Sequence, residues 1–323
     1  MKEHIHWVDV AKGLGMFLVI LGHTIKNSEI LWWIYSFHMP LFFFLSGYLS
    51  EQNGRISNVK IFVIKKSKSL LLPFVFFRLL LVFYWLIVER YFRELDIGPI
   101  WFLLVLYFVD IIYAPILLRL KRKIFSILSL ILSIILFYAL KSVTTDSLFF
   151  HQFIGWGLRI LNGGIWFSLA FFVGKCTRDV KLQNKWHAFV YLCCLTISLF
   201  AYKYNGNVSI YSNTINNIFL YLLLGICGIG AVLYSSKLLI KRHYFIEKIG
   251  FNSIIILAVH EPIKRIVIKL SEYILGGQMQ QNFWFALIIS IVVLFSCVPI
   301  VYIFKYTKKH TGKLGSTLLF FIK

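Results

Sequence analysis

Acidic residues are scarce in this chain, which has 13 aspartates and glutamates in 323 residues against 34 lysines and arginines. Charged residues of both signs make up 15% of the sequence, whereas 59% is hydrophobic and the mean hydropathy is +0.79. Soluble globular domains carry about 25% charged residues, so the composition excludes an ordinary soluble domain. It predicts an all-α polytopic membrane protein, a bundle of transmembrane helices in the lipid bilayer.

Cysteines are also few, and their number is odd. They lie mostly inside apolar runs without metal-ligand spacing, so we expect small core residues and neither a disulfide framework nor a bound metal. The first apolar run lacks a small-residue cleavage site, so no cleavable signal peptide is expected. Without a low-complexity linker, residues 1–323 are predicted to form a single integral-membrane domain. The five cysteines are Cys176, Cys193, Cys194, Cys227 and Cys297.

The net charge of +21 raises the question of a nucleic-acid partner. The basic residues cluster in short loops between apolar runs and leave no continuous soluble basic face, so no nucleic-acid binding is expected. Every second loop is basic, as the positive-inside rule predicts for cytoplasmic loops. Both termini are therefore predicted to be cytoplasmic.

Apolar runs recur along the chain at the length of about twenty residues that a hydrocarbon core of about 30 Å requires. We predict about ten spanning helices, with a basic loop over residues 50–69 between the second and the third. The predicted spans are residues 8–25, 30–49, 70–88, 100–118, 124–140, 154–174, 186–202, 216–234, 249–270 and 283–304.

The first apolar run, WVDVAKGLGMFLVILGH, carries ionisable residues at a depth where such groups are costly. Lys12 and His23 are eleven residues apart. At about 100° per residue, both side chains fall on one helix face, separated by roughly 16 Å along the axis. The lysine could bind the charged end of a long anionic ligand. The histidine would then lie near the other end of that ligand, where it could transfer a proton. Asp9 precedes Lys12 by three residues, which predicts an orienting ion pair.

Several sequence pieces carry a family resemblance. The WVDVAKG start, with a histidine eleven residues after its lysine, is followed by FHMPLFFFLSGYL, IWFLLVLY, GGIWFSLAFFVGK and IGFNSIIILAVHEP. In these pieces, which extend over nearly the whole chain, the protein resembles bacterial acyltransferase family 3, the integral-membrane envelope O-acyltransferases, and within it the fucose 4-O-acetylase branch. The resemblance implies a multi-pass protein of the bacterial inner membrane. Such a protein would move an acetyl group from cytoplasmic acetyl-CoA to a sugar hydroxyl of a capsule, O-antigen or exopolysaccharide, or of a lipid-linked precursor.

The resemblance also implies a donor site and a base. The family pattern of a basic residue, ten intervening positions and a histidine is matched by Lys12 and His23. A pair of arginines at the start of the third span is replaced by Lys65 and Lys68, and lysine binds phosphate without the fork of arginine. Together with Lys66, these lysines would hold the acetyl-CoA phosphates. His23 would act as general base on the acceptor hydroxyl, and an acetyl-imidazole intermediate is a second route.

Each of these roles has a structural alternative. His23 is otherwise a histidine that is hydrogen-bonded for structure, and Lys12 a side chain that snorkels to the cytoplasmic interface. Glu261 either orients a histidine or pairs with Lys264 or Arg265. For the aromatic and basic candidates near the interfaces, the alternative is a belt or anchor position. The candidates for binding the acceptor glycan are His38, Trp101, Arg159, His260 and Glu261.

Two other classes of function remain open from the sequence. Ten spans with buried charge also describe a transporter of lipid-linked glycans, although the chain lacks Gly/Pro-broken helices in matched halves. A non-catalytic partner in envelope polysaccharide assembly is the other class. An acetyl-CoA-dependent activity would separate the enzyme from both.

Overall fold

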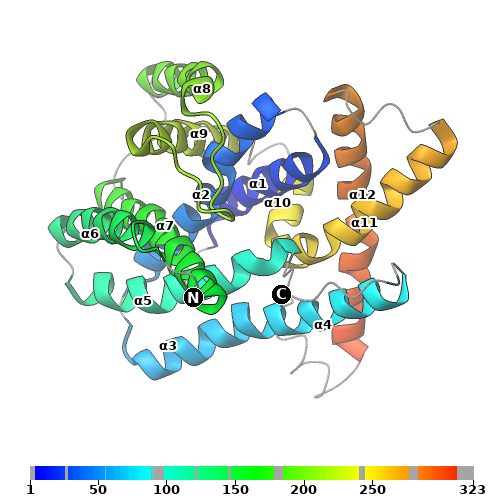
Figure 1. Ribbon diagram of the computed structural model, residues 1–323, viewed down its shortest axis with the longest axis horizontal. Coiled ribbons are helices and arrows are strands. Elements are labelled where there is room, and N and C mark those ends of the chain that lie inside the picture. The colour runs from blue at the N-terminus through cyan, green and yellow to red at the C-terminus, as the bar shows by residue number, and fades with distance from the viewer. Residues whose placement is uncertain are drawn as a thin grey trace. The chain divides into compact units, whose positions relative to one another are not determined.

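The computed structural model describes residues 4–25, 28–54, 56–88, 90, 98–120, 123–144, 147–177, 185–239, 244–275 and 283–310. These residues are almost entirely helical (Figure 1), and within them the extended structure is one isolated antiparallel bridge between Ser209 and Thr214. The prediction of an all-α fold is confirmed. The helices are α1 (His6–Thr24), α2 (Ser28–Asn53), α3 (Val59–Lys66), η1 (Ser67–Leu71), α4 (Leu72–Ile87), η2 (Gly98–Ile100), α5 (Trp101–Leu120), α6 (Lys123–Lys141), α7 (Leu148–Thr177), α8 (Lys185–Asn205), α9 (Ile218–Leu239), α10 (Tyr244–Phe251), α11 (Ser253–Leu275) and α12 (Phe283–His310).

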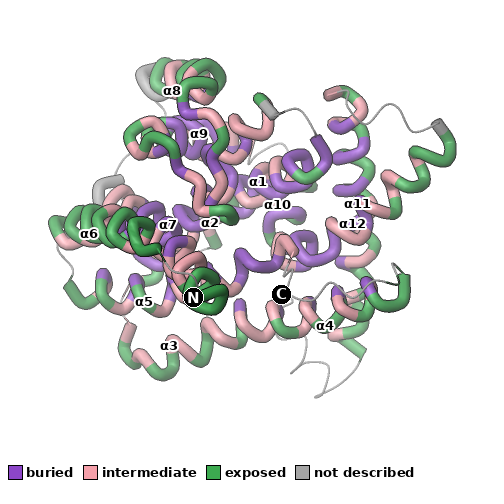
Figure 2. Tube along the Cα trace, in the orientation of Figure 1, coloured by how far each residue is buried: buried purple, intermediate pink, exposed green. Residues whose placement is uncertain are grey.

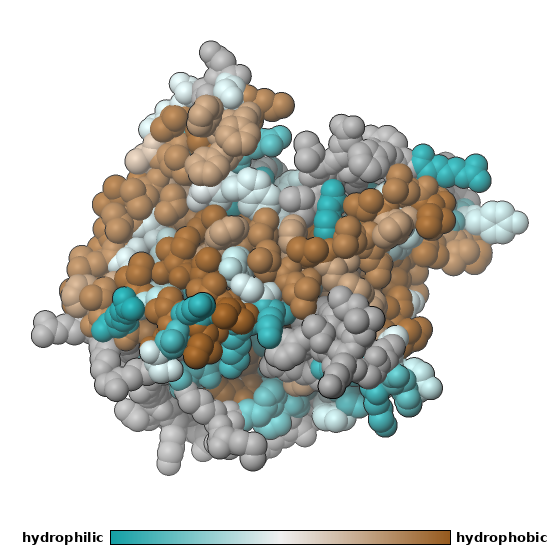
Figure 3. Space-filling model, turned by 90° about the horizontal axis from the view of Figure 1, so that it is seen from below, coloured by the Kyte–Doolittle hydropathy of each residue, from teal (hydrophilic) through white to brown (hydrophobic). Residues whose placement is uncertain are grey.

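Eight helical segments among the described residues are long and apolar enough to cross a membrane. Two of the predicted spans, α8 and α11, fall outside this set although they have 21 and 23 residues. In α11 the cause is charge, because Glu261, Lys264 and Arg265 interrupt its apolar sequence. Large apolar side chains are exposed on the α-helices from α3 to α12, and hydrophobic residues cover much of the face in Figure 3, as a lipid-facing surface requires.

Two predicted boundaries differ from the structure. The predicted loop over residues 50–69 is largely helical, because α2 continues to Asn53 and α3 is followed by the π-helical turn η1. Pro73, near the start of α4, has no N–H and its ring crowds the carbonyl four residues earlier, which favours a widened turn at this point. The predicted helix over residues 249–270 is broken at Asn252, whose side-chain Nδ2 donates to the Lys248 carbonyl at 2.6 Å.

The contacts divide the chain into two compact units, and each is described by itself. Unit 1 comprises residues 1–4, 32–66 and 105–234, and unit 2 comprises residues 5–31, 67–104 and 235–323. The single domain over residues 1–323 stays a prediction.

Unit 2 is built around α1, which packs against α10, α11 and α12 and is buried along most of its length (Figure 2). Small residues permit the close approach of α1 and α10. A Cβ added at Gly250 would overlap the backbone of Asp9, and one added at Gly13 would overlap Ile246. Close approach at small residues is a common way of packing membrane helices.

Unit 1 has a buried polar network between α7 and α9. The Trp166 indole Nε1 donates to the Tyr221 hydroxyl at 2.8 Å, and that hydroxyl donates to Asn162 Oδ1 at 2.7 Å. Both aromatic side chains are fully buried. Hydrogen bonds of this kind tie helices together where water is absent.

Gly225 on α9 allows the Trp166 ring to occupy this place, because an added Cβ would overlap the indole. We expect Gly225→Ala to destabilise the protein by about 1–3 kcal/mol through overpacking. Gly230→Ala is a matched control on the same helix, where the nearest neighbour of an added Cβ is Cys194 Sγ at 3.7 Å. Thermal unfolding of purified protein in detergent should show a lower Tm for Gly225→Ala and not for Gly230→Ala; equal Tm values would contradict the expectation.

Candidate active site

Lys12 and His23, predicted to share one face of α1, are both accessible, although Met16 and Val19, which lie between them on that face, are buried. The helix is unbroken from His6 to Thr24, so the spacing argument applies to it directly. Of its 19 residues, 12 are buried, whereas His23 is exposed and the Lys12 side chain is 26% exposed. Both residues can therefore meet a ligand.

Asp9 and Lys12 form the predicted ion pair. Lys12 Nζ donates to Asp9 Oδ1 at 3.0 Å, and the Asp9 side chain is 6% exposed. The acidic residue lies in the first turn of α1, where the helix dipole favours negative charge. The carboxylate thus holds the ammonium group in place on its helix face.

His23 lies next to His260, and the structure brings these two histidines together from α1 and α11. Their ring centres are 5.4 Å apart and the rings are inclined at 41°. His260 is fully buried, and its Nδ1 lies 2.8 Å from the Leu257 carbonyl oxygen and 3.2 Å from that of Ile256. The sequence identified both histidines but gave no reason to place them side by side.

Glu261 pairs with two cations next to the histidine pair. Its carboxylate lies 2.7 Å from Lys264 Nζ and 3.1 Å from Arg265 Nε. Of the two alternatives for Glu261, the structure shows the pairing, with both cations, and the orientation of a histidine by Glu261 stays a prediction. Lys264 Nζ also donates to the backbone carbonyl of His23 at 3.2 Å, at the end of α1 where helical carbonyls lack N–H partners. Arg265 stacks on the Trp85 ring, with its Cζ 4.3 Å from the ring centre.

The lysines predicted to bind phosphate differ in their surroundings. Lys65 and Lys68 are exposed. Lys66 instead forms an ion pair with Asp110, whose side chain is 1% exposed, at 2.6 Å, and Ser46 Oγ donates to the second Asp110 oxygen at 2.9 Å. Because these three lysines and Lys12 are divided between the two units, their gathering around one phosphate site stays a prediction.

Two candidates for binding the acceptor, His38 and Trp101, are almost completely buried, at 7% and 8% exposure. His38 Nδ1 donates to the Ile34 carbonyl at 2.9 Å, and its ring centre is 5.1 Å from that of Tyr35. For His38 the structure thus gives a structural hydrogen bond within α2. An acceptor-binding role for either residue stays a prediction.

Arg159 holds the segment between α8 and α9 against α7. Its Nε donates to the Tyr211 carbonyl at 2.8 Å, and its Cζ lies 4.9 Å from the Trp156 ring centre and 4.8 Å from the Tyr211 ring centre. The Tyr211 side chain remains exposed. A glycan contact of Arg159 stays a prediction.

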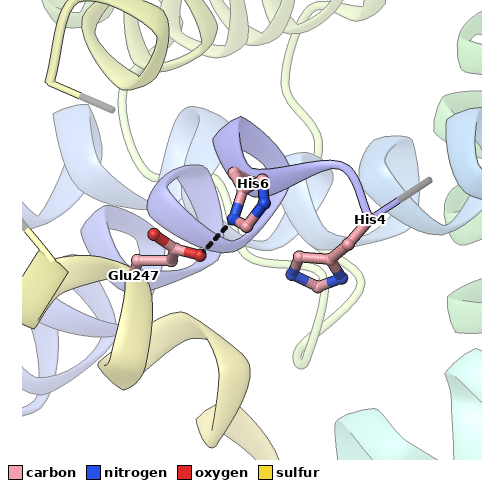
Figure 4. Close-up of side chains that lie close together, drawn as sticks. All are labelled: His4, His6 and Glu247. Atoms are coloured by element: carbon pink, nitrogen blue, oxygen red, sulfur yellow. Dashed lines mark hydrogen bonds and ion pairs between the residues drawn. The ribbon is translucent and has the colours of Figure 1, made fainter. Parts of the chain in front are cut away.

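A further contact between a histidine and a carboxylate was not expected from the sequence. His6 Nδ1 lies 2.6 Å from Glu247 Oε1, and Figure 4 shows the His6 ring turned toward this carboxylate. The pair joins the start of α1 to α10. Its residues are separated by 241 positions, so no local pattern could have indicated it.

Comparison with known families identifies the family of the chain. A family model described as an acyltransferase domain matches residues 5–302, nearly the whole chain. No curated protein and no solved structure matches the chain. The branch of fucose 4-O-acetylases stays a prediction. With its apolar helices and this match, the chain belongs to acyltransferase family 3 and is a multi-pass membrane acyltransferase.

Proposed function

We propose that the protein transfers an acetyl group from cytoplasmic acetyl-CoA to a sugar hydroxyl of a surface polysaccharide or its lipid-linked precursor, in the inner membrane of a bacterium. The family membership shows an acyltransferase, and one structural observation supports the more specific proposal. Lys12 and His23 are both accessible on α1, a helix that is otherwise mostly buried. A histidine buried for a structural hydrogen bond would not be exposed in this way.

The charge and length of the donor suit the positions of Lys12 and His23. Acetyl-CoA has its phosphates at one end and its thioester at the end of a flexible arm. Lys12 would bind the phosphates with Lys65 and Lys68, which are exposed and able to form charge-assisted hydrogen bonds. Lys66 would add positive charge, although Asp110 balances it. The roughly 16 Å between Lys12 and His23 along α1 is similar to the reach of the extended arm.

His23 would act as the general base. Its imidazole takes the proton of the sugar hydroxyl as that oxygen attacks the thioester carbonyl carbon. The new C–O bond forms, the C–S bond breaks, and the departing sulfur of CoA takes up the proton from His23. The exposure of His23 supports this role, because a base must reach the hydroxyl from which it removes the proton.

The experiment that tests the proposal measures ester-linked acetyl groups on the cell-surface polysaccharide by NMR. Three strains of the host bacterium are compared: the parent, a deletion strain, and the deletion strain carrying the wild-type gene. We expect the acetyl signal of one sugar position to disappear on deletion and to return on complementation. If no acetyl ester changes while the amount of surface polysaccharide falls, the transporter or assembly partner becomes the better explanation.

A further inference from the structure

His260 has one ring nitrogen whose role the proposed function does not explain. A carbonyl oxygen only accepts hydrogen bonds, so the contacts of Nδ1 with the carbonyls of Leu257 and Ile256 require a proton on Nδ1. An uncompensated charge is costly at a fully buried position, so the ring is neutral and Nε2 carries a lone pair. Among the residues that the structure describes, Nε2 has no hydrogen-bond partner. His260 thus presents a buried acceptor of fixed position.

The carboxylate of Glu261 cannot donate a hydrogen bond to Nε2 of His260. A lone pair needs a donor, and the oxygens of Glu261 are instead engaged by Lys264 and Arg265. The imidazole of His23 lies against the His260 ring. A hydrogen bond of about 2.9 Å between two imidazole nitrogens, with about 1.1 Å from each nitrogen to its ring centre, places the ring centres about 5 Å apart. The 5.4 Å between His23 and His260 is slightly longer, so the two rings are adjacent but not hydrogen-bonded in this structure, and a shift of a few tenths of an ångström would bring them within bonding distance.

We propose that His260 is a positioning residue for His23: its Nε2 accepts a hydrogen bond from one ring N–H of His23 and so fixes the tautomer and orientation of that ring. This inference rests on the proposed role of His23 as base. With one nitrogen of His23 donating to His260, the other carries the lone pair that a general base needs. In the catalytic triad a buried carboxylate orients the histidine in this way, and here a neutral imidazole takes that place.

Lys264 also holds α1 close to α11, through the backbone of His23. Its ammonium group binds the His23 carbonyl and the Glu261 carboxylate, and Glu261 directly follows His260 in α11. The end of α1 and the turn of α11 that carries His260 are therefore tied by a second contact. This tie restricts the distance between the two rings.

A readout that does not require activity tests the inference. In detergent-solubilised protein labelled with ¹⁵N in its histidines, the ring nitrogen shifts distinguish the two neutral tautomers, and His23→Gln assigns the His23 signals. We expect one tautomer of His23 in the wild type and a mixture of both in His260→Phe. An unchanged single tautomer in His260→Phe would overturn the inference, and so would a mixture in the wild type.

A series of three variants separates this role from a structural one. Gln places a possible acceptor near the position of Nε2, Asn retains only a donor near the position of Nδ1, and Phe fills the volume without either. We expect His260→Gln to retain most of kcat, and His260→Asn and His260→Phe to lose about 10- to 100-fold, as when the hydrogen-bond partner of a metal-binding histidine is removed. The KM for acetyl-CoA should change little. Retention of kcat in His260→Asn with loss in His260→Gln would instead assign His260 to capping the backbone.

The acceptor in this assay is de-esterified surface polysaccharide from the deletion strain, and transfer is followed with radiolabelled acetyl-CoA. If the wild-type protein transfers no acetyl group, the proposed function fails, and the tautomer measurement still decides whether His260 orients His23. If the wild type is active and the three variants equal it, the inference fails and the proposed function stands.

Discussion

Replacing His23 with glutamine should lower the rate of acetyl transfer by about a hundred- to ten-thousand-fold, the usual contribution of a general base. Glutamine preserves much of the size and hydrogen bonding of histidine but cannot take up a proton at working pH. The loss should therefore appear in kcat, with the KM for acetyl-CoA little changed. Membrane vesicles with wild-type or variant protein at matched levels, assayed with radiolabelled acetyl-CoA, provide the measurement.

His151→Gln is the matched control for this prediction. His151 is an exposed histidine on α7 and has no place in the proposed site. The control variant should transfer acetyl groups at the wild-type rate. Full activity of His23→Gln would show that another group removes the proton from the acceptor, and the mechanism above would have to be abandoned.

The second large effect concerns the ion pair of Lys66 and Asp110. We expect Asp110→Ala to destabilise the protein by about 3–5 kcal/mol, because it leaves the Lys66 charge without its partner in a partly buried place. Asp110 is 1% exposed and accepts hydrogen bonds from both Lys66 and Ser46, so its loss removes two contacts at once. Thermal unfolding in detergent measures the effect.

A double variant separates stability from donor binding at this site. Lys66→Met together with Asp110→Leu removes both charges and keeps the volume, and such replacements are often neutral or stabilising. We expect its Tm to be near that of the wild type, well above that of Asp110→Ala. If Lys66 also attracts the acetyl-CoA phosphates, the stable double variant will show a raised KM for acetyl-CoA. A Tm of Asp110→Ala equal to that of the wild type would show that the pair contributes nothing to stability.

The sequence was a good guide to features that depend on neighbouring residues. Run length and hydropathy predicted the positions of the helices, and a spacing of three residues predicted the pair of Asp9 and Lys12. Helix breaks were missed, because a π turn before Pro73 and the side-chain hydrogen bond of Asn252 leave the hydrophobic pattern unchanged.

Long-range contacts in the candidate site could not be predicted from the sequence, for a different reason. Lys264 donates to a residue 241 positions away, and this contact exists only because α1 packs against α11. The charge of Lys66 was likewise read as available for phosphate, because nothing local to it indicates that Asp110 lies against it. Spacing within a helix predicts which residues share a face, and tertiary packing decides what that face meets.

The packing of α1 against the last three helices has a consequence for biosynthesis. The ribosome makes α1 at the start of translation, and α10, α11 and α12 near its end. Until those segments are inserted, the nascent chain holds Lys12 and His23 in the membrane without the partners that α11 supplies to the end of α1. A product truncated after α9 would contain the proposed base but neither His260 nor Lys264. Completion of the chain, and not insertion of its first helix, is therefore the step at which the site is assembled.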